Sequence, residues 1–402
     1  SPVPASSKAA RTIIRPKPSA TGASAARSIC PTASAAAKVA PSRGRTNGPR
    51  ASSGSRCTPP SSRLRPRSRP AVQPIRADGH HPNERWPHWG TNPYKVMPHV
   101  SLESKRIGET YQLRPTDVIV VSFPKTGTTW TQNSCEQLRT GAGGYDFDDI
   151  TIRQPWIEFA HDLGQDLDDE QVAKPRIFKS HQLLSAVNPG GKCLCIVRDP
   201  EATLVSWFAF QKAKGRPGYA EYEDANEYIA DKGADIFGGE CCFGMNIWDM
   251  YAELWSARND PFVRILVYEA LVADGPAYLN HLPMIADFLG MDDADAALYS
   301  KVAFLVSRDQ MVRNVDAFDD HFITERGREL GRALRIMEPA AKVRSADGKK
   351  KDTALTEKTV EWMEDQWLER MTPLTGHASY DEFAAAIADF NAGEEEVEII
   401  EE

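Results

Sequence analysis

The chain has 402 residues, of which 41% are hydrophobic, and its formal net charge is −8. This length allows one large domain or two ordinary ones, and the apolar content allows a sizeable core. No apolar run approaches the roughly 20 residues that cross a bilayer, so we expect no membrane span. The seven cysteines are too few for a disulfide scaffold and lack the paired CxxC spacing of zinc sites, so we expect reduced structural thiols.

The first 77 residues differ sharply in composition from the rest. They hold 15 of the 48 Lys and Arg residues and no Asp or Glu, so the other 325 residues combine 33 basic with 56 acidic side chains, a formal charge of −23. A segment rich in Ala, Ser, Arg and Pro without a hydrophobic period cannot bury enough surface to fold. We therefore expect residues 1–77 to be disordered.

The composition of residues 1–77 is typical of an organelle transit peptide, and a plastid is favoured over a mitochondrion. A solvated basic tail and a non-coding stretch translated by a faulty gene model are the alternatives, and in those cases the protein is expected in the cytoplasm. Binding to nucleic acid is disfavoured because no aromatic residues are interleaved with the basic ones.

Residues 78–110 contain several Pro and Trp residues and are expected to form an irregular lead-in, whereas residues 111–392 have the pattern of a folded domain. Three runs are apolar and β-branched like parallel strands buried on both faces, namely residues 118–123, 192–198 and 262–268. Apolar periods and breakers predict helices over residues 128–139, 200–211, 246–256, 356–370 and 379–390. This alternation predicts an α/β fold with a central parallel sheet flanked by helices, followed by an acidic tail over residues 393–402.

Residues 123–130 read Phe-Pro-Lys-Thr-Gly-Thr-Thr-Trp and connect the first expected strand to the first expected helix. Such a turn directs backbone N–H groups and the positive end of the helix dipole to one place, which favours an anion. Lys125 adds positive charge, and Thr126, Thr128 and Thr129 add hydroxyl donors. The nucleotide motif G-x-x-x-x-G-K-[ST] is absent, which disfavours an ordinary kinase or NTPase. A turn that merely caps the helix is the alternative.

Two later segments add groups that suit a phosphate or sulfate ligand. Lys179-Ser-His181 ends a short apolar stretch and provides an imidazole that titrates near neutral pH. Arg198 follows the second expected strand, and Ser206 lies about two turns along the helix that Pro200 begins. A guanidinium group matches a terminal phosphate better than an ammonium group does.

Together these segments resemble the soluble sulfotransferases, which use 3′-phosphoadenosine 5′-phosphosulfate (PAPS) as sulfuryl donor and a small-molecule hydroxyl or amine as acceptor. The resemblance spans roughly residues 113–390 and implies the P-loop-like sulfotransferase fold. It implies that His181 is the catalytic base, that Lys125 contacts the bridging oxygen of the donor, and that Lys179 neutralises the sulfuryl oxygens. No metal is required. The residues that it implies in donor binding are Lys125, Thr126, Gly127, Thr128, Thr129, Trp130, Arg198, Ser206, Tyr268, Ser307, Met311 and Arg344.

One nucleotide-binding segment departs from the family pattern. The family has Arg-Lys-Gly there, whereas Arg344 is followed by Ser345 and Ala346. Backbone without glycine is less permissive, so donor affinity could be weaker. A catalytically inactive nucleotide-binding member of the fold is therefore one alternative, and a P-loop phosphotransferase is another. Leu355 replaces a lysine of the family's dimerisation motif, which leaves the oligomeric state open.

Overall fold

The computed structural model describes residues 100–187, 190–216, 218–232, 246–272, 281–332, 339–343 and 355–393. The predicted disordered segment, Arg344 and all of the acidic tail beyond Gly393 lie outside the described residues.

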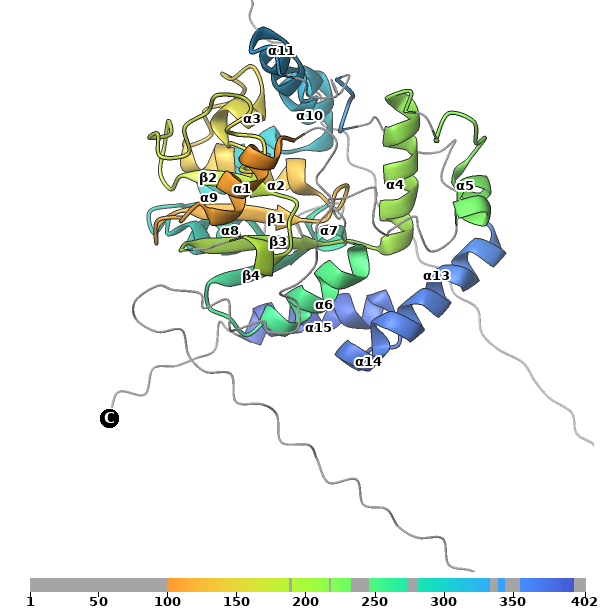
Figure 1. Ribbon diagram of the computed structural model, residues 1–402. Coiled ribbons are helices and arrows are strands. Elements are labelled where there is room, and N and C mark those ends of the chain that lie inside the picture. The colour runs from red at the N-terminus through yellow and green to blue at the C-terminus, as the bar shows by residue number, and fades with distance from the viewer. Residues whose placement is uncertain are drawn as a thin grey trace, which may run out of the picture. The chain divides into compact units, whose positions relative to one another are not determined.

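A parallel sheet of four strands forms the centre of the described domain, in the order β2-β1-β3-β4 (Figure 1). The strands are β1 (Val118–Ser122), β2 (Ile177–Ser180), β3 (Lys192–Val197) and β4 (Val263–Val267). The three predicted strands are confirmed as β1, β3 and β4, each one or two residues shorter than expected. The sequence analysis missed β2, because four residues that include Lys179 and Ser180 carry too little apolar signal.

Alternate side chains of the central strand β1 enter two different apolar clusters. Val118 and Val120 belong to one cluster, while Ile119 and Val121 belong to the other, and all four are fully buried. This explains the continuous apolar run in the sequence, because successive side chains point to opposite faces and both faces are covered.

Helices cover both faces of the sheet (Figure 1). The cluster of Val118 includes side chains of α2 (Thr128–Arg139), α7 (Tyr268–Leu271), α8 (His281–Leu289) and α9 (Ala296–Leu305). The cluster of Ile119 includes side chains of α4 (Pro200–Ala213), α5 (Ala225–Lys232), α6 (Ile247–Ala257), α13 (Glu357–Arg370) and α15 (Tyr380–Gly393). The remaining helical segments are α1 (Leu102–Thr110), α3 (Ile150–Arg153), η2 (Leu184–Ala186), α10 (Arg308–Arg313), η5 (Val315–Phe318), α11 (His321–Glu329) and α14 (Thr372–Thr375). The five predicted helices are confirmed to within a few residues at their ends.

Part of the predicted irregular lead-in is instead the helix α1, so the expectation was wrong for these residues. Ser101 caps this helix by accepting a hydrogen bond from the Ser104 amide at 3.0 Å. The Ser104 hydroxyl donates to the Glu158 carbonyl at 2.8 Å, and Gly108 packs against the backbone of Ile157. Tertiary contacts of this kind do not appear in a local sequence pattern. Within the described residues, no helix combines the length and apolarity needed to cross a membrane.

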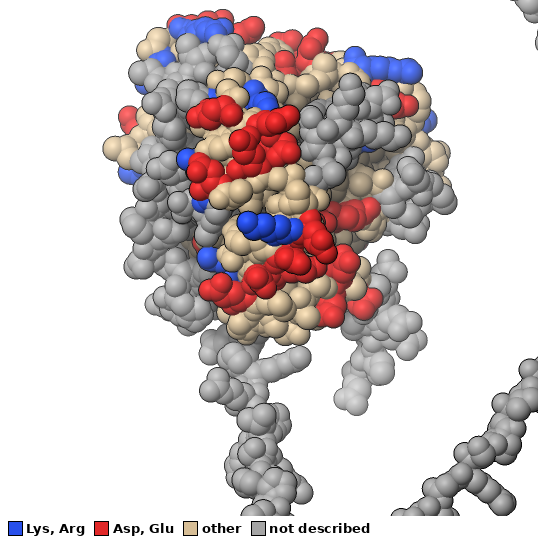
Figure 2. Space-filling view, turned by 90° about the vertical axis from the view of Figure 1, so that its right-hand side faces the viewer, with Lys and Arg blue, Asp and Glu red and all other residues tan. Residues whose placement is uncertain are grey.

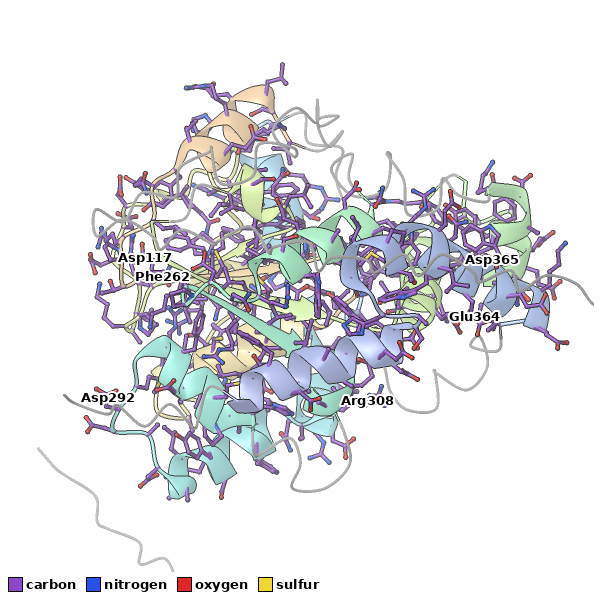
Figure 3. The ribbon with its side chains drawn as sticks, turned by 90° about the horizontal axis from the view of Figure 1, so that it is seen from below. Asp117, Phe262, Asp292, Arg308, Glu364 and Asp365 are labelled. Carbon is purple, nitrogen blue, oxygen red and sulfur yellow. The ribbon has the colours of Figure 1, made fainter. Side chains whose placement is uncertain are left out.

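The two ends of the sheet differ in chemistry. Asp117 and Phe262, which precede β1 and β4, lie together at the amino end of the strands (Figure 3). There the buried Arg176 forms an ion pair with Asp117, and both side chains are 1% exposed. The carboxyl end of the same parallel strands carries residues 123–130, His181 and Arg198. Ligands of open α/β sheets bind at this end.

Candidate functional site at the carboxyl end of the sheet

Residues 123–130, called the anion loop below, form a tight turn between β1 and α2. Gly127 has φ +117°, and Lys125 has φ +72°. The Thr126 hydroxyl donates to the Phe123 carbonyl at 2.7 Å, and the Ser122 and Thr128 hydroxyls are 2.6 Å apart. These hydroxyl contacts fix the path of the loop.

The amino end of α2 lacks a side-chain cap. Its N-cap residue is Gly127, and no side chain accepts a hydrogen bond there, whereas Asp199 accepts two amide hydrogen bonds at the start of α4. The first N–H groups of a helix have no partner within the helix, and the helix dipole is positive at this end. The geometry therefore suits an anion, as the sequence predicted.

His181 follows the edge strand β2, and its ring reaches the end of β1. Its Nδ1 lies 2.7 Å from the Ser122 carbonyl oxygen. A carbonyl oxygen can only accept a hydrogen bond, so Nδ1 carries the proton and Nε2 holds the lone pair. Burial lowers the pKa of His181 well below its usual value, and the charge of Lys179 lowers it further. The imidazole is therefore neutral at physiological pH, which is the protonation state of a base.

Lys179 is nearly buried beside His181. Its Nζ lies 3.8 Å from the ring centroid of Trp156, and that ring meets His181 edge-on at 5.0 Å. Burial lowers the pKa of Lys179 to about 7, with a further contribution from the charge of Lys342. A bound anion next to Nζ would stabilise the charged form and raise the pKa again.

Arg198 joins the anion loop to Tyr268. Its Nη1 donates to the Lys125 carbonyl at 2.8 Å, and its guanidinium carbon lies 4.4 Å from the ring centroid of Tyr268. The same ring packs so closely against Gly127 that a Cβ there would lie 2.5 Å from its Cδ2. Nε of Arg198 is buried and has no hydrogen-bond partner in the part of the chain that the structure describes. Lys125, Gly127, Arg198 and Tyr268 thus meet, as the sequence predicted.

The other described residues that were predicted to bind the donor lie on or at the start of α2, α4 and α10. Met311 is buried with Phe318 in a small apolar cluster, against which Trp130 packs. Ser307 is the N-cap residue of α10, but its hydroxyl accepts no capping hydrogen bond. Thr129 and Ser206 are half-buried on α2 and α4. The roles of these residues in donor binding stay predictions.

Sequence reasoning named Lys179 but missed three charged residues that act together with it, Asp320, Lys342 and Lys214. Asp320 is buried and forms an ion pair with Lys342. Burial alone would raise its pKa, but the charges of Lys342, Lys179 and Lys214 outweigh burial and hold the pKa below its usual range. Asp320, Lys342 and Lys214 come from separate parts of the chain and belong to no motif, although Asp320 has a positive φ, which is uncommon outside glycine.

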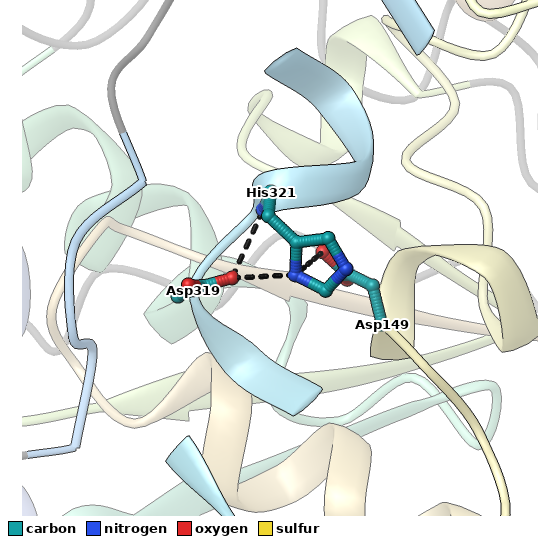
Figure 4. A group of neighbouring side chains, drawn as sticks. All are labelled: Asp149, Asp319 and His321. Carbon is teal, nitrogen blue, oxygen red and sulfur yellow. Dashed lines mark hydrogen bonds and ion pairs between the residues drawn. The ribbon is translucent and has the colours of Figure 1, made fainter. Parts of the chain in front are cut away.

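Asp149, Asp319 and His321 form a second polar group, which has the composition of a metal site (Figure 4). Nδ1 of His321 lies 2.8 Å from Asp319, and Nε2 lies 3.1 Å from Asp148. Burial alone would lower the pKa of His321, but the hydrogen bonds to Asp148 and Asp319 raise it to about 9. A protonated imidazole has no lone pair for a metal, so these contacts fit an ion-paired histidine better than a ligand set.

One outer face of the domain carries mainly the opposite charge. Figure 2 shows bands of acidic side chains on the face that includes α5 and α13. The exposed acidic residues of these two helices are Glu227, Asp231, Glu357, Glu361, Glu364, Asp365 and Glu369. An anionic ligand is therefore attracted only where positive groups converge locally, as they do around the anion loop.

Comparison with known proteins agrees with this geometry. The family model of the sulfotransferase domain matches residues 115–372, which is more than half of the chain. The chain belongs to the sulfotransferase family. The chain is 29% identical over 198 residues to cytosolic sulfotransferase 16 of Arabidopsis thaliana, a match that covers 46% of the chain and 56% of that protein. It is 27% identical over 202 residues to sulfotransferase 4A1 of Mus musculus, covering 48% of the chain and 66% of that protein.

These matches span between about half and two thirds of the relatives' own lengths. Among solved structures, mouse sulfotransferase SULT7A1 complexed with PAP superposes with a TM-score of 0.50 at 19% identity, over 73% of this chain and 96% of that chain. This likeness confirms the predicted α/β sulfotransferase fold.

Proposed function

We propose that this chain moves a sulfuryl group from PAPS to a hydroxyl or amine of a small-molecule acceptor, with His181 as general base. The observation that supports this most is the hydrogen bond between Nδ1 of His181 and the Ser122 carbonyl. It assigns the lone pair to Nε2, and burial keeps the ring unprotonated. The base and the anion loop are attached to adjacent strands of one sheet, β2 and β1.

The residues around the loop fit an anionic nucleotide. The uncapped amino end of α2 offers backbone N–H donors for a phosphate, and the buried Nε of Arg198 lacks a hydrogen-bond partner within the described chain. The mouse structure that superposes on this chain is complexed with PAP, which is PAPS without its sulfuryl group. When bound, the donor supplies the sulfuryl group, whose bond to the phosphate oxygen breaks as the acceptor atom bonds to sulfur.

Each side chain then has a defined task. Nε2 of His181 takes the acceptor proton, and a positioned base contributes about 10²–10⁴ to the rate. Lys125 stabilises negative charge on the phosphate oxygen, and Lys179 neutralises the sulfuryl oxygens. A hydrogen-bond donor aimed at developing charge contributes a factor of about 10²–10³ to the rate. Arg198, Ser206 and Arg344 are expected to hold the 3′-phosphate. None of these tasks uses a metal ion.

To test this proposal, the full chain is incubated with sulfur-labelled PAPS and a panel of phenols, alcohols and amines. We expect His181→Ala to reduce kcat by at least about 100-fold, while the Kd of adenosine 3′,5′-bisphosphate changes little. His161→Ala is the matched control, because His161 is a part-exposed histidine whose ring faces Glu103. Undiminished transfer by His181→Ala would remove His181 from this role.

The altered sequence after Arg344 keeps a second candidate open. If the chain binds adenosine 3′,5′-bisphosphate and transfers sulfate to no acceptor of the panel, the inactive nucleotide-binding protein replaces the enzyme as the best account.

Delivery to a plastid or another organelle by residues 1–77 also belongs to this proposal, on the strength of their composition. Fusing these residues to a fluorescent protein in plant cells tests it. Diffuse cytoplasmic fluorescence would contradict organelle targeting.

A further inference from the structure

A lysine that no motif includes lies beside the anion loop. Lys214 directly follows α4 and stands four residues after Phe210, on the same side of the helix. Its Nζ is 4.5 Å from the ring centroid of Phe210, and Nζ of Lys125 is 4.0 Å from the same centroid. Because both distances end at the same centroid, the distance between the two Nζ atoms cannot exceed their sum.

The ammonium group of Lys214 lacks an acceptor. Its Nζ is buried and has no hydrogen-bond partner in the described ranges of the chain. Burying an ammonium group without an acceptor is costly, so a buried one points to a ligand that completes it. Burial lowers the pKa of Lys214 to about 8, which still leaves most of the group charged at neutral pH.

The surrounding charges do not neutralise Lys214. Asp320 and Asp319 favour its charged form, while Lys342 and Arg216 oppose it. Asp320 is already paired with Lys342, and it also acts on Lys179. Asp320 is therefore shared among three ammonium groups, and within the described residues Nζ of Lys214 has no carboxylate as a hydrogen-bond partner.

Lys214 stands apart in sequence from the residues assigned to the 3′-phosphate. Arg198 precedes α4 and Ser206 lies in its middle, whereas Lys214 lies eight residues beyond Ser206. At about 1.5 Å per residue the backbones of Ser206 and Lys214 are roughly 12 Å apart along the helix axis. Lys214 is therefore available to an anion other than the 3′-phosphate.

We propose that Lys214 selects acceptors that carry a carboxylate near the hydroxyl or amine that receives the sulfuryl group. This inference rests on the proposed function and names the acceptor class of the same site. A hydrogen bond between ions in a buried position is strong enough to distinguish a carboxylate from its amide about tenfold or more. An ammonium group in place of the carboxylate would be repelled by the ammonium group of Lys214.

The test measures binding, so it does not depend on turnover. The full chain, saturated with adenosine 3′,5′-bisphosphate, is titrated calorimetrically with 4-hydroxyphenylacetate, its carboxamide and tyramine. A larger pair, 6-hydroxy-2-naphthoate and its carboxamide, covers a wider acceptor. The variants are Lys214→Met, Lys214→Arg and the control Lys212→Met, which removes an exposed lysine two residues away on α4 whose Nζ donates to the Tyr222 and Glu223 carbonyls.

In the unsubstituted chain, we expect at least one carboxylate to bind about tenfold more tightly than its carboxamide. Tyramine should bind more weakly than both 4-hydroxyphenylacetate and its carboxamide. Lys214→Met should abolish the difference while leaving the Kd of the carboxamide unchanged. Lys214→Arg should retain most of it, and Lys212→Met all of it.

Equal binding of carboxylate and carboxamide in both pairs would overturn the inference. So would a loss of adenosine 3′,5′-bisphosphate binding in Lys214→Met, because Lys214 would then serve the donor. Failure of the nucleotide to bind the unsubstituted chain would instead contradict the proposed function, and the acceptor titrations repeated without nucleotide would still decide the role of Lys214.

Discussion

At the scale of single residues, the site is built from groups that destabilise the fold. Lys179 and Lys214 are ammonium groups with depressed pKa values, and burial is the main cause in both. Glu158, another buried group near Lys179, has its pKa raised to about 7, also by burial. Groups that oppose folding in this way concentrate at functional sites, where their charge is used on a ligand.

Lys179 should make the stability of the fold depend on pH. Its folded-state pKa of about 7 is below the unfolded value of 10.5, so the unfolded chain binds more protons between these pH values. Stability therefore rises with pH across this window, and the destabilisation is fully present below it. We expect Lys179→Met to raise the free energy of unfolding at pH 7 by about 1–4 kcal/mol and to flatten the rise between pH 7 and 9.

Thermal unfolding of both proteins at pH 7 and at pH 9 measures this change in stability. Lys174→Met is the control, because its side chain is 64% exposed. If Lys179→Met were less stable than the unsubstituted chain at pH 7, the cost assigned to the buried lysine would be refuted.

At the scale of elements, the turn between β1 and α2 decides the site. Gly127 is needed there for two independent reasons, its φ of +117° and the ring of Tyr268 against its Cα. The start of α2 has no side-chain cap, and the pairing of β1 with β2 brings Ser180 beside Val121, next to His181. Strand pairing therefore sets the distance between base and anion loop.

Gly127→Ala should damage both fold and ligand binding. A methyl group would be forced against Tyr268 in a strained conformation, so we expect a stability loss of about 1–3 kcal/mol. Adenosine 3′,5′-bisphosphate should bind at least about tenfold more weakly, because the amides of the turn must move.

Gly141→Ala provides the comparison for this substitution, since φ is +66° there and no atom lies within 4 Å of the added methyl group. It should cost only the backbone strain and leave the Kd unchanged. Equal Kd values for both variants by calorimetry would show that the turn does not hold the nucleotide.

At the scale of the whole molecule, charge is divided between the outside and the site. Residues 78–402 carry a formal charge of −23, and the exposed faces of α5 and α13 are acidic, while lysines and Arg198 surround the anion loop. Such a distribution discourages nonspecific binding of polyanions and restricts anionic ligands to one place.

The ligand that stabilises the molecule should therefore be diagnostic. We expect adenosine 3′,5′-bisphosphate at 100 times its Kd to add about 2.7 kcal/mol to the free energy of unfolding, which is a rise of several degrees in Tm. ATP with Mg²⁺ should give a much smaller shift. A larger shift with ATP and Mg²⁺ would favour the P-loop phosphotransferase instead.

The sequence by itself determined the strands β1, β3 and β4, the helices that flank them and the residues of the anion loop, because apolar runs, caps and glycine are local signals. It also predicted that Lys125, Arg198 and Tyr268 would gather, since the carboxyl ends of parallel strands share one edge. It missed α1 and β2, which contacts with residues distant in sequence stabilise.

Only the tertiary structure decided the electrostatics of the site. The tautomer of His181 depends on a carbonyl of another strand, and the surroundings of Lys214 depend on Asp320 and Lys342, more than 100 residues away in sequence. Burial and charge act through space, so no spacing along the chain encodes them.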